Sequence, residues 1–171
     1  QTFLETSEYK TLEEGVSAQK EQTTYNGYKG RGLIQLTWKD NYVAYGKYKG
    51  EDFTGANRIK IATPKYAVDS AAWFWRKGKS RDLNDLATKN DLIGVSAIVN
   101  GGFNHFDNDG HGGKENRKAY LLKAFKTLNV KNCKNIPPST LNTLEEFKLE
   151  NSVVYNMVGE SFGWGLWHDA E

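Results

Sequence analysis

The most informative segment of the sequence is TYNGYKGRGLIQLTWKDNY, residues 24–42. Its first half is polar and contains three glycines, which predicts a loop or a short irregular hairpin over residues 22–32. The glycines on either side of Arg31 allow the backbone to approach a ligand closely. The second half leads into a predicted helix, because tyrosines recur at three-residue intervals up to Tyr48 and Gly50 follows them.

Capping residues and apolar periodicity predict further helices on both sides of this stretch. They cover the start of the chain up to Gly15, residues 64–78 with Pro64 at their start, residues 92–100 capped by Asp91, and residues 114–128. The predicted fold class is therefore mainly α with a small irregular β element.

Length and composition indicate which class of protein the chain belongs to. The 171 residues, 38% apolar and 26% charged, predict one soluble globular domain. Cys133 is the sole cysteine, so no internal disulfide forms, and the three histidines lack the spacing of a zinc site. The sequence as given carries no apolar run of membrane-spanning length and no signal peptide. We therefore expect no metal, no cofactor and no encoded export route.

Charge and aromatic content narrow the choice of partner. Residues 1–21 hold five acids and two bases, whereas the remaining 150 residues hold 16 acids and 21 bases. A mildly basic body suits an anionic polymer such as a bacterial cell wall or a nucleic acid. Aromatic residues make up 13% of the chain, and both sugar rings and bases stack on such side chains. These numbers alone favour neither partner.

Residues 131–140, KNCKNIPPST, mark the single plausible boundary, because Pro137 and Pro138 interrupt the helical pattern. We expect a catalytic domain over residues 1–130. Residues 131–171 then form a C-terminal extension that packs on the body.

The acidic start of the chain contains a candidate pair of catalytic carboxylates. Glu5 and Glu14 are nine residues apart, which on one straight helix separates them by about 180° and about 13 Å. A helix that breaks near Thr11 would instead let them face each other. An inverting glycosidase needs its acid and its base roughly 6.5 to 9.5 Å apart, with a water molecule between them.

The glycine-rich stretch resembles glycoside hydrolase family 19, the chitinases and phage endolysins with a lysozyme-like fold. The family's hallmark is Tyr-x-Gly-Arg-Gly-x-Ile-Gln-Leu-Thr/Ser followed by Asn-Tyr. Ten positions in fifteen fit: Tyr28, Gly30, Arg31, Gly32, Ile34, Gln35, Leu36, Thr37, Asn41 and Tyr42. The resemblance continues through QTFLET, AAWFW and IVNGG and covers about residues 1 to 128.

The resemblance implies a fold of two helical lobes that flank a substrate cleft. It also implies roles for individual residues. Glu5 would be the general acid, with Phe3 and Leu4 as apolar surroundings, and Glu14 the base that activates water, with Glu13 the weaker candidate. Thr37 and Asn41 would hold the nucleophilic water or the acetamido group of the sugar. The other predicted sugar contacts are Tyr28, Arg31, Gln35, Asn100 and Arg117.

Three features depart from the family pattern. Leu4 stands where the family often has His, and Phe103 with Asn104 replaces an acid found in many chitinases, which favours the endolysin branch. The chain starts four residues before Glu5, so we expect a domain trimmed from a larger protein.

Asp107 and Asp109 begin an EF-hand-like loop, but the twelfth position is Lys118 where calcium requires Glu, so a polar loop without metal is predicted.

We therefore predict a monomeric muramidase that cleaves β-1,4 bonds between the N-acetylated sugars of peptidoglycan by inversion. It would be made in the bacterial cytoplasm and reach the cell wall from a phage or a secretion system, and a secreted effector would have a cognate immunity protein. The alternatives are a chitinase and a non-catalytic sugar-binding module. Nucleic-acid binding is the third and weakest alternative. The partner that we predict is the glycan strand of peptidoglycan, not a nucleic acid.

Overall fold

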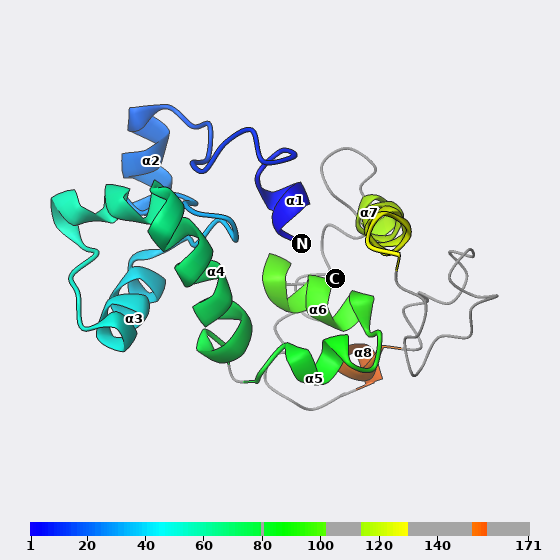
Figure 1. Ribbon diagram of the computed structural model, residues 1–171. Helices are drawn as coiled ribbons and strands as arrows, with labels where there is room; N and C mark the ends of the chain where they lie inside the picture. The colour runs from blue at the N-terminus through cyan, green and yellow to red at the C-terminus, as the bar shows by residue number, and fades with distance from the viewer. Residues whose placement is uncertain (80, 102–113, 130–151, 157–171) are drawn as a thin grey trace. The chain divides into compact units, whose positions relative to one another are not determined.

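The computed structural model describes residues 1–79, 81–101, 114–129 and 152–156 (Figure 1). The chain divides into unit 1, Gln1–Asp82, and unit 2, Leu83–Glu171. Both units are built from helices in their described parts, so the predicted mainly α class is confirmed. The predicted pair of lobes with a cleft between them stays a prediction.

Unit 1 contains four α-helices and one 3₁₀-helix among its described residues. They are α1 (Thr2–Glu5), α2 (Ala18–Tyr25), α3 (Lys39–Lys49), η1 (Gly55–Ala62) and α4 (Pro64–Lys77). The predicted helices at α3 and α4 are confirmed. Gly50 ends α3 in the left-handed region at φ 69°, and Pro64 occupies the first turn of α4, where a missing N–H is tolerated.

Helix α2 corrects the prediction that residues 22–32 form a loop. Ser17 caps this helix, because its hydroxyl accepts a hydrogen bond from the backbone N–H of Lys20 at 3.1 Å. Asn26 then ends the helix in the left-handed conformation at φ 50°. The glycines of this stretch all follow Asn26, and the residues before it are helical. The helix therefore extends four residues into the predicted loop.

The small irregular β element that was predicted lies within residues 12–36 of unit 1. Isolated antiparallel bridges join Glu13 to Arg31 and Arg31 to Leu36. The N–H of Gly32 donates to the carbonyl of Leu12 at 2.8 Å, which extends the first bridge. Backbone hydrogen bonds therefore hold the segment around Glu13 beside the glycine-rich turn.

Aromatic side chains form much of the core of unit 1. Tyr42, Tyr45 and Phe53 are fully buried, and the rings of Tyr45 and Phe53 lie 4.8 Å apart. Gly32 packs against this core from the β element, at φ 79°. A Cβ atom there would lie 3.1 Å from the Ser70 hydroxyl, so the site requires a glycine.

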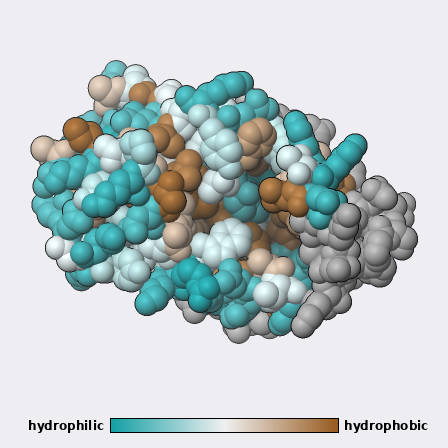
Figure 2. All heavy atoms as spheres, viewed as in Figure 1, coloured by the Kyte–Doolittle hydropathy of each residue, from teal (hydrophilic) through white to brown (hydrophobic). Residues whose placement is uncertain are grey.

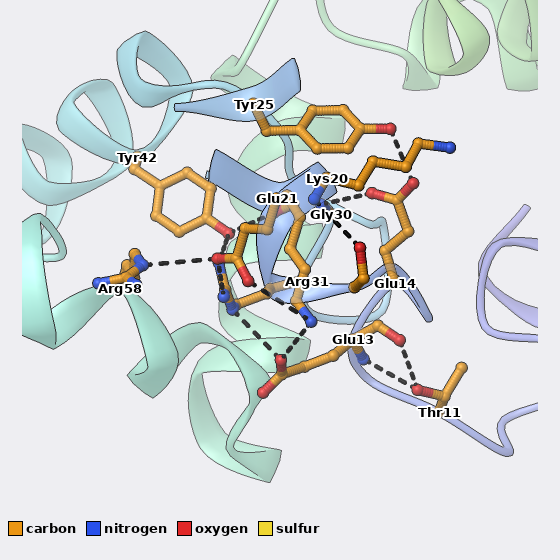
Figure 3. Close-up of polar contacts among 12 residues, drawn as sticks. Thr11, Glu13, Glu14, Lys20, Glu21, Tyr25, Gly30, Arg31, Tyr42 and Arg58 are labelled. Carbon is orange, nitrogen blue, oxygen red and sulfur yellow. Dashed lines mark hydrogen bonds and ion pairs between the residues drawn. The ribbon is translucent and has the colours of Figure 1, made fainter. Parts of the chain in front are cut away.

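Arg31 is a buried charged residue of unit 1, and Figure 3 shows its polar contacts. Its side chain is 2% exposed, and its guanidinium donates to Glu21 Oε1 at 2.6 Å and to the Tyr42 hydroxyl at 3.1 Å. Glu13 adds a weaker ion pair at 3.6 Å from Nε. A buried guanidinium is tolerated only when it is paired and hydrogen bonded. Its two terminal nitrogens meet that requirement, whereas the buried Nε has the Glu13 ion pair but no hydrogen bond.

Glu21 is the main counter-ion of this cluster. Burial alone would raise the pKa of Glu21, but the hydrogen bond and charge of Arg31 lower it, and the charges of Lys29 and Arg58 add to that effect. The net result is a pKa below the ordinary value of 4.5. Glu21 therefore stays ionised in the folded protein near neutral pH.

Unit 2 is arranged around a buried helix. Its helices are α5 (Asn84–Ala87), α6 (Leu92–Asn100), α7 (Lys114–Thr127) and α8 (Val153–Asn156), and α6 packs against the other three. The predicted helices at α6 and α7 are confirmed. Asp91 caps α6 through the N–H of Gly94 at 2.7 Å and also accepts from the N–H of Val153 at 2.8 Å. One carboxylate thus joins α6 to α8.

Most of the predicted C-terminal extension and the predicted polar loop with Asp107 and Asp109 lie outside the described residues. Within the described ranges, no helix is long and apolar enough to cross a membrane. No group of three acidic, histidine or cysteine side chains in those ranges is placed to hold a metal ion. On the face shown in Figure 2, hydrophobic side chains of the described part form small groups among hydrophilic ones.

We expect Glu21→Gln to lower the free energy of unfolding at neutral pH by about 3 kcal/mol, because the buried Arg31 guanidinium loses its carboxylate. The lowered pKa of Glu21 means that its contribution is present above 4.5, the unfolded value, and is lost as the pH falls through the folded-state pKa. Urea denaturation at neutral and acid pH measures this difference. Glu8→Gln, in an exposed ion pair with Lys10, is the control. A difference between wild type and Glu21→Gln that is independent of pH would contradict the ion-pair account.

Candidate active site

The carboxylate of Glu14 is clamped against the glycine-rich turn (Figure 3). Its Oε2 accepts from the N–H of Gly30 at 3.1 Å, and its Oε1 accepts from the Tyr25 hydroxyl at 2.8 Å. The backbone N–H of Glu14 donates to the carbonyl of Gly30 at 2.9 Å. These three bonds fix both the position and the orientation of the carboxylate, which remains partly exposed.

Tyr25, at the end of α2, acts as a hydrogen-bond donor in this arrangement. The hydrogen bond to the Glu14 carboxylate raises the pKa of Tyr25 above its ordinary value of 10.0, and partial burial adds to the rise. The phenol therefore keeps its proton throughout the neutral range and holds Glu14 as an acceptor.

Glu13 and Glu14 are adjacent in sequence but serve different purposes. Successive side chains of an extended segment point to opposite sides. Glu13 lies 3.1 Å from Lys29 Nζ and 3.6 Å from Arg31 Nε, so it belongs to the ion-pair cluster. The Glu14 carboxylate accepts hydrogen bonds from a hydroxyl and a backbone amide, so Glu14 is the better candidate for a base.

We call the hydrogen bonds of Tyr25 and Gly30 to the Glu14 carboxylate the clamp. Two further predicted site residues lie next to it, against Gly30. A Cβ atom at Gly30 would lie 2.8 Å from Gln35 Oε1 and 3.4 Å from Thr37 Oγ1. The side chains of Gln35 and Thr37 therefore lie against the backbone unit that binds Glu14. A side chain at position 30 would displace them, which explains the need for glycine here.

The polar groups of Gln35, Thr37 and Asn41 hold the turn together. The Thr37 hydroxyl donates to the carbonyl of Gln35 at 2.7 Å, and the Asn41 amide donates to the carbonyl of Thr37 at 2.7 Å. The Gln35 amide donates to the carbonyl of Gly32 at 3.0 Å. Because the Thr37 proton points to the protein, its oxygen can accept a hydrogen bond from a water molecule.

Glu5 is the last residue of α1 and is partly exposed. The helix ends there because the buried Thr6 bonds back to the carbonyl of Thr2 at 2.7 Å and captures the N–H of Tyr9 at 3.0 Å. Ser7, Glu8 and Tyr9 all have positive φ, between 49° and 64°. The predicted break near Thr11 therefore occurs earlier, at Thr6, and places Glu5 and Glu14 on separate segments of unit 1.

Phe3 and Leu4 precede Glu5 on α1, and both are partly buried. The Phe3 ring packs edge-on against Tyr9, with their centroids 5.3 Å apart. Apolar atoms therefore lie close to the Glu5 segment in sequence and in space. The distance between the Glu5 and Glu14 carboxylates that inversion requires stays a prediction.

Two predicted sugar contacts are engaged within the protein. Tyr28 is 8% exposed, and its hydroxyl accepts from the N–H of Gly55 at 3.2 Å. Arg31 is the buried centre of the ion-pair cluster described above. Both side chains therefore form hydrogen bonds within unit 1, and their predicted contacts with a sugar stay predictions.

Asn100 and Arg117 belong to unit 2. Arg117 Nη2 donates to Asn100 Oδ1 at 2.5 Å, which joins the end of α6 to α7. Asn100 is the last residue of α6, and Gly101 follows it in the left-handed conformation at φ 76°. The predicted contacts of Asn100 and Arg117 with substrate stay predictions.

Sequence reasoning missed Tyr25, Glu21 and Arg58 as members of the site and its support. Arg58 Nε lies 3.6 Å from Glu21 Oε1, although 37 positions separate the two residues. The Ser17 cap was the local signal that could have revealed α2, and with it the common helix of Tyr25 and Glu21. No comparable local signal pointed to Arg58.

Comparison with known proteins tests the family resemblance. No family model matches the chain. A glycosyl hydrolase family 19 domain-containing protein of Haemophilus influenzae is 36% identical over 80 residues, which are 47% of this chain and 36% of that protein. An endochitinase of Arabidopsis thaliana is 40% identical over 60 residues, 32% of this chain and 21% of the relative. A basic endochitinase of Brassica napus is 36% identical over 58 residues, 34% and 22% of the two chains.

The chain spans between about a fifth and about a third of the length of these relatives. The bacterial relative is named for the family whose glycine-rich hallmark the chain carries at residues 28–42. Gly30, within that stretch, binds the Glu14 carboxylate. This agreement confirms the resemblance of the chain to glycoside hydrolase family 19 and supports a glycoside hydrolase.

Proposed function

We propose that this chain hydrolyses the β-1,4 bonds between N-acetylated sugars of peptidoglycan, with inversion at the anomeric carbon. The observation that supports this proposal best is the clamp on Glu14. A partly exposed carboxylate is held by Tyr25 and Gly30, and Thr37 lies against the same turn. In a chain of a glycoside hydrolase family, a fixed carboxylate beside a hydroxyl is suited to activating water.

The proposed reaction uses two carboxyl groups. Glu14 takes a proton from water while the water oxygen bonds to the anomeric carbon. Glu5 gives its proton to the glycosidic oxygen as the bond from that oxygen to the anomeric carbon breaks. Glu14 ends protonated and Glu5 ends ionised, and proton exchange with solvent restores both groups. Thr37 accepts a hydrogen bond from the attacking water and so orients it.

Substrate recognition in this proposal rests on amide and hydroxyl groups. An N-acetylated sugar presents an acetamido group and several hydroxyls. Gln35 lies on the same turn as Thr37, and Asn41 lies in the first turn of α3. The amide nitrogens of both side chains donate within the protein, and their amide oxygens are groups that can accept hydrogen bonds from a sugar. The cluster around Arg31 holds this turn in place beneath them.

Peptidoglycan is preferred to chitin on sequence grounds. Glu5 and Glu14 have the nine-residue spacing of endolysin-type members, and Cys133 alone contrasts with the disulfide-bonded plant chitinases. Chitin is the second candidate, because the names of the plant relatives describe endochitinases.

We further propose a bacterial setting for the reaction. The protein is made in the cytoplasm and reaches the periplasm or cell wall through a phage or a secretion system. It acts there as a monomer on glycan strands. In the case of a secreted effector, a cognate immunity protein protects the producing cell.

Replacement of either carboxyl group tests the catalytic roles. We expect Glu5→Gln and Glu14→Gln each to lower kcat/KM on purified sacculi by at least about 100-fold, because each removes one proton transfer. Release of reducing ends measures the rate. Glu8→Gln, which changes an exposed carboxylate that pairs with the exposed Lys10, should keep the wild-type rate. Full activity of Glu14→Gln would exclude it as the base.

Digestion of two substrates distinguishes the candidate functions. We expect soluble muropeptides from purified sacculi and little oligosaccharide from colloidal chitin. Mass spectrometry of the products identifies the sugar at the new reducing end, which is N-acetylmuramic acid for a muramidase. Products from chitin alone would establish the chitinase alternative, whereas binding to sacculi without any new reducing ends would establish a sugar-binding module.

A further inference from the structure

Trp38 lies at the surface beside the clamped carboxylate. Its side chain is 53% exposed, although it is one of the largest apolar residues of unit 1. The indole packs on the ring of Tyr25, with centroids 5.3 Å apart and planes tilted by 53°. Tyr25 in turn donates its hydroxyl proton to Glu14. A single side chain therefore separates the exposed indole from the proposed base.

The backbone of Trp38 is held in a conformation that favours glycine. Its φ is 72° and its ψ is 139°, a region that other residues rarely occupy. The N–H of Trp38 donates to the carbonyl of Tyr28 at 2.9 Å, and its carbonyl accepts from the N–H of Asn41 at 3.1 Å. The chain thus holds a tryptophan where glycine would be less strained, and about half of the residue is left exposed to solvent.

We infer that Trp38 is a stacking platform for a pyranose ring of the glycan strand, in a subsite next to Glu14. The C–H face of a pyranose packs well on the flat face of an indole. Thr37, which precedes Trp38, and Asn41, in the first turn of α3, carry hydroxyl and amide groups of the kind that bind the polar edge of such a sugar.

The charges around Trp38 agree with a sugar ring as the stacked group. Lys39 and Asp40 follow it, both exposed, and their opposite charges give this part of α3 no excess positive potential. A nucleic-acid strand would require basic residues along its path. The inference rests on the proposed function, since it assumes that the ligand is a glycan strand.

Binding to sacculi tests this inference without any need for turnover. All variants are made in the full chain with Glu5→Gln, and co-sedimentation with purified sacculi gives the half-saturating concentration. We expect Trp38→Ala and Trp38→Gly to raise this concentration about five- to tenfold, the loss of one aromatic contact. Tyr48→Ala, which removes a 52% exposed ring elsewhere on α3, should change it less than about twofold.

Thermal unfolding separates binding from folding. Trp38→Gly relieves the backbone strain, so it should unfold at or above the wild-type temperature and still bind more weakly. Wild-type binding by both Trp38 variants would overturn the inference, as would an equal loss in Tyr48→Ala or no binding by the Glu5→Gln parent. Reducing-end release by the wild-type chain is measured separately. Its absence, with Trp38-dependent binding intact, would remove the proposed hydrolysis and leave this inference standing.

Discussion

The ion pair between Arg31 and Glu21 is the interaction on which unit 1 depends. Arg31 is buried, and its guanidinium joins α2 through Glu21 to α3 through Tyr42. Its backbone also forms both bridges of the β element, to Glu13 and to Leu36. One residue therefore connects two helices and two extended segments. Because a buried guanidinium without a carboxylate is strongly unfavourable, these elements must assemble together.

This constraint explains how the candidate active site is built. Gly30 precedes Arg31, so the position of Arg31 sets the position of the N–H that binds Glu14. Successive side chains of the extended segment point to opposite sides, so Glu13 joins the ion-pair cluster and Glu14 faces Tyr25. Residues in unfavourable backbone conformations lie close by, at Ser7 to Tyr9 after Glu5 and at Trp38. Such conformations persist only where the surroundings hold them, and they often accompany function.

Features with local signals could be predicted from the sequence. Pro64 predicted the start of α4, and the structure confirms it. Asp91 and Gly101 predicted the start and the end of α6, and they cap this helix in the structure. The family hallmark pointed to the candidate site, and within it Thr37 and Gln35 lie against the Gly30 backbone that binds Glu14. Their roles toward a substrate stay predictions.

Features that depend on distant partners could not be predicted. The role of Arg31 depends on Glu21, ten residues away across a helix end, and that of Glu21 also depends on Arg58. Glycine-rich composition suggested a loop where the Ser17 cap builds α2. In each case a specific hydrogen bond or ion pair decided the structure, and neither periodicity nor composition records such a contact.

In the proposed reaction, Glu14, fixed by Tyr25 and Gly30, directs water onto the anomeric carbon while Glu5 protonates the leaving oxygen. The anomeric configuration of freshly released reducing ends tests this pair of roles, measured by proton NMR in the first minutes of a digestion of purified sacculi. Single displacement by water at a β-linked sugar predicts the α-anomer as the initial product. Initial formation of the β-anomer would show retention through a covalent intermediate and would contradict the role assigned to Glu14.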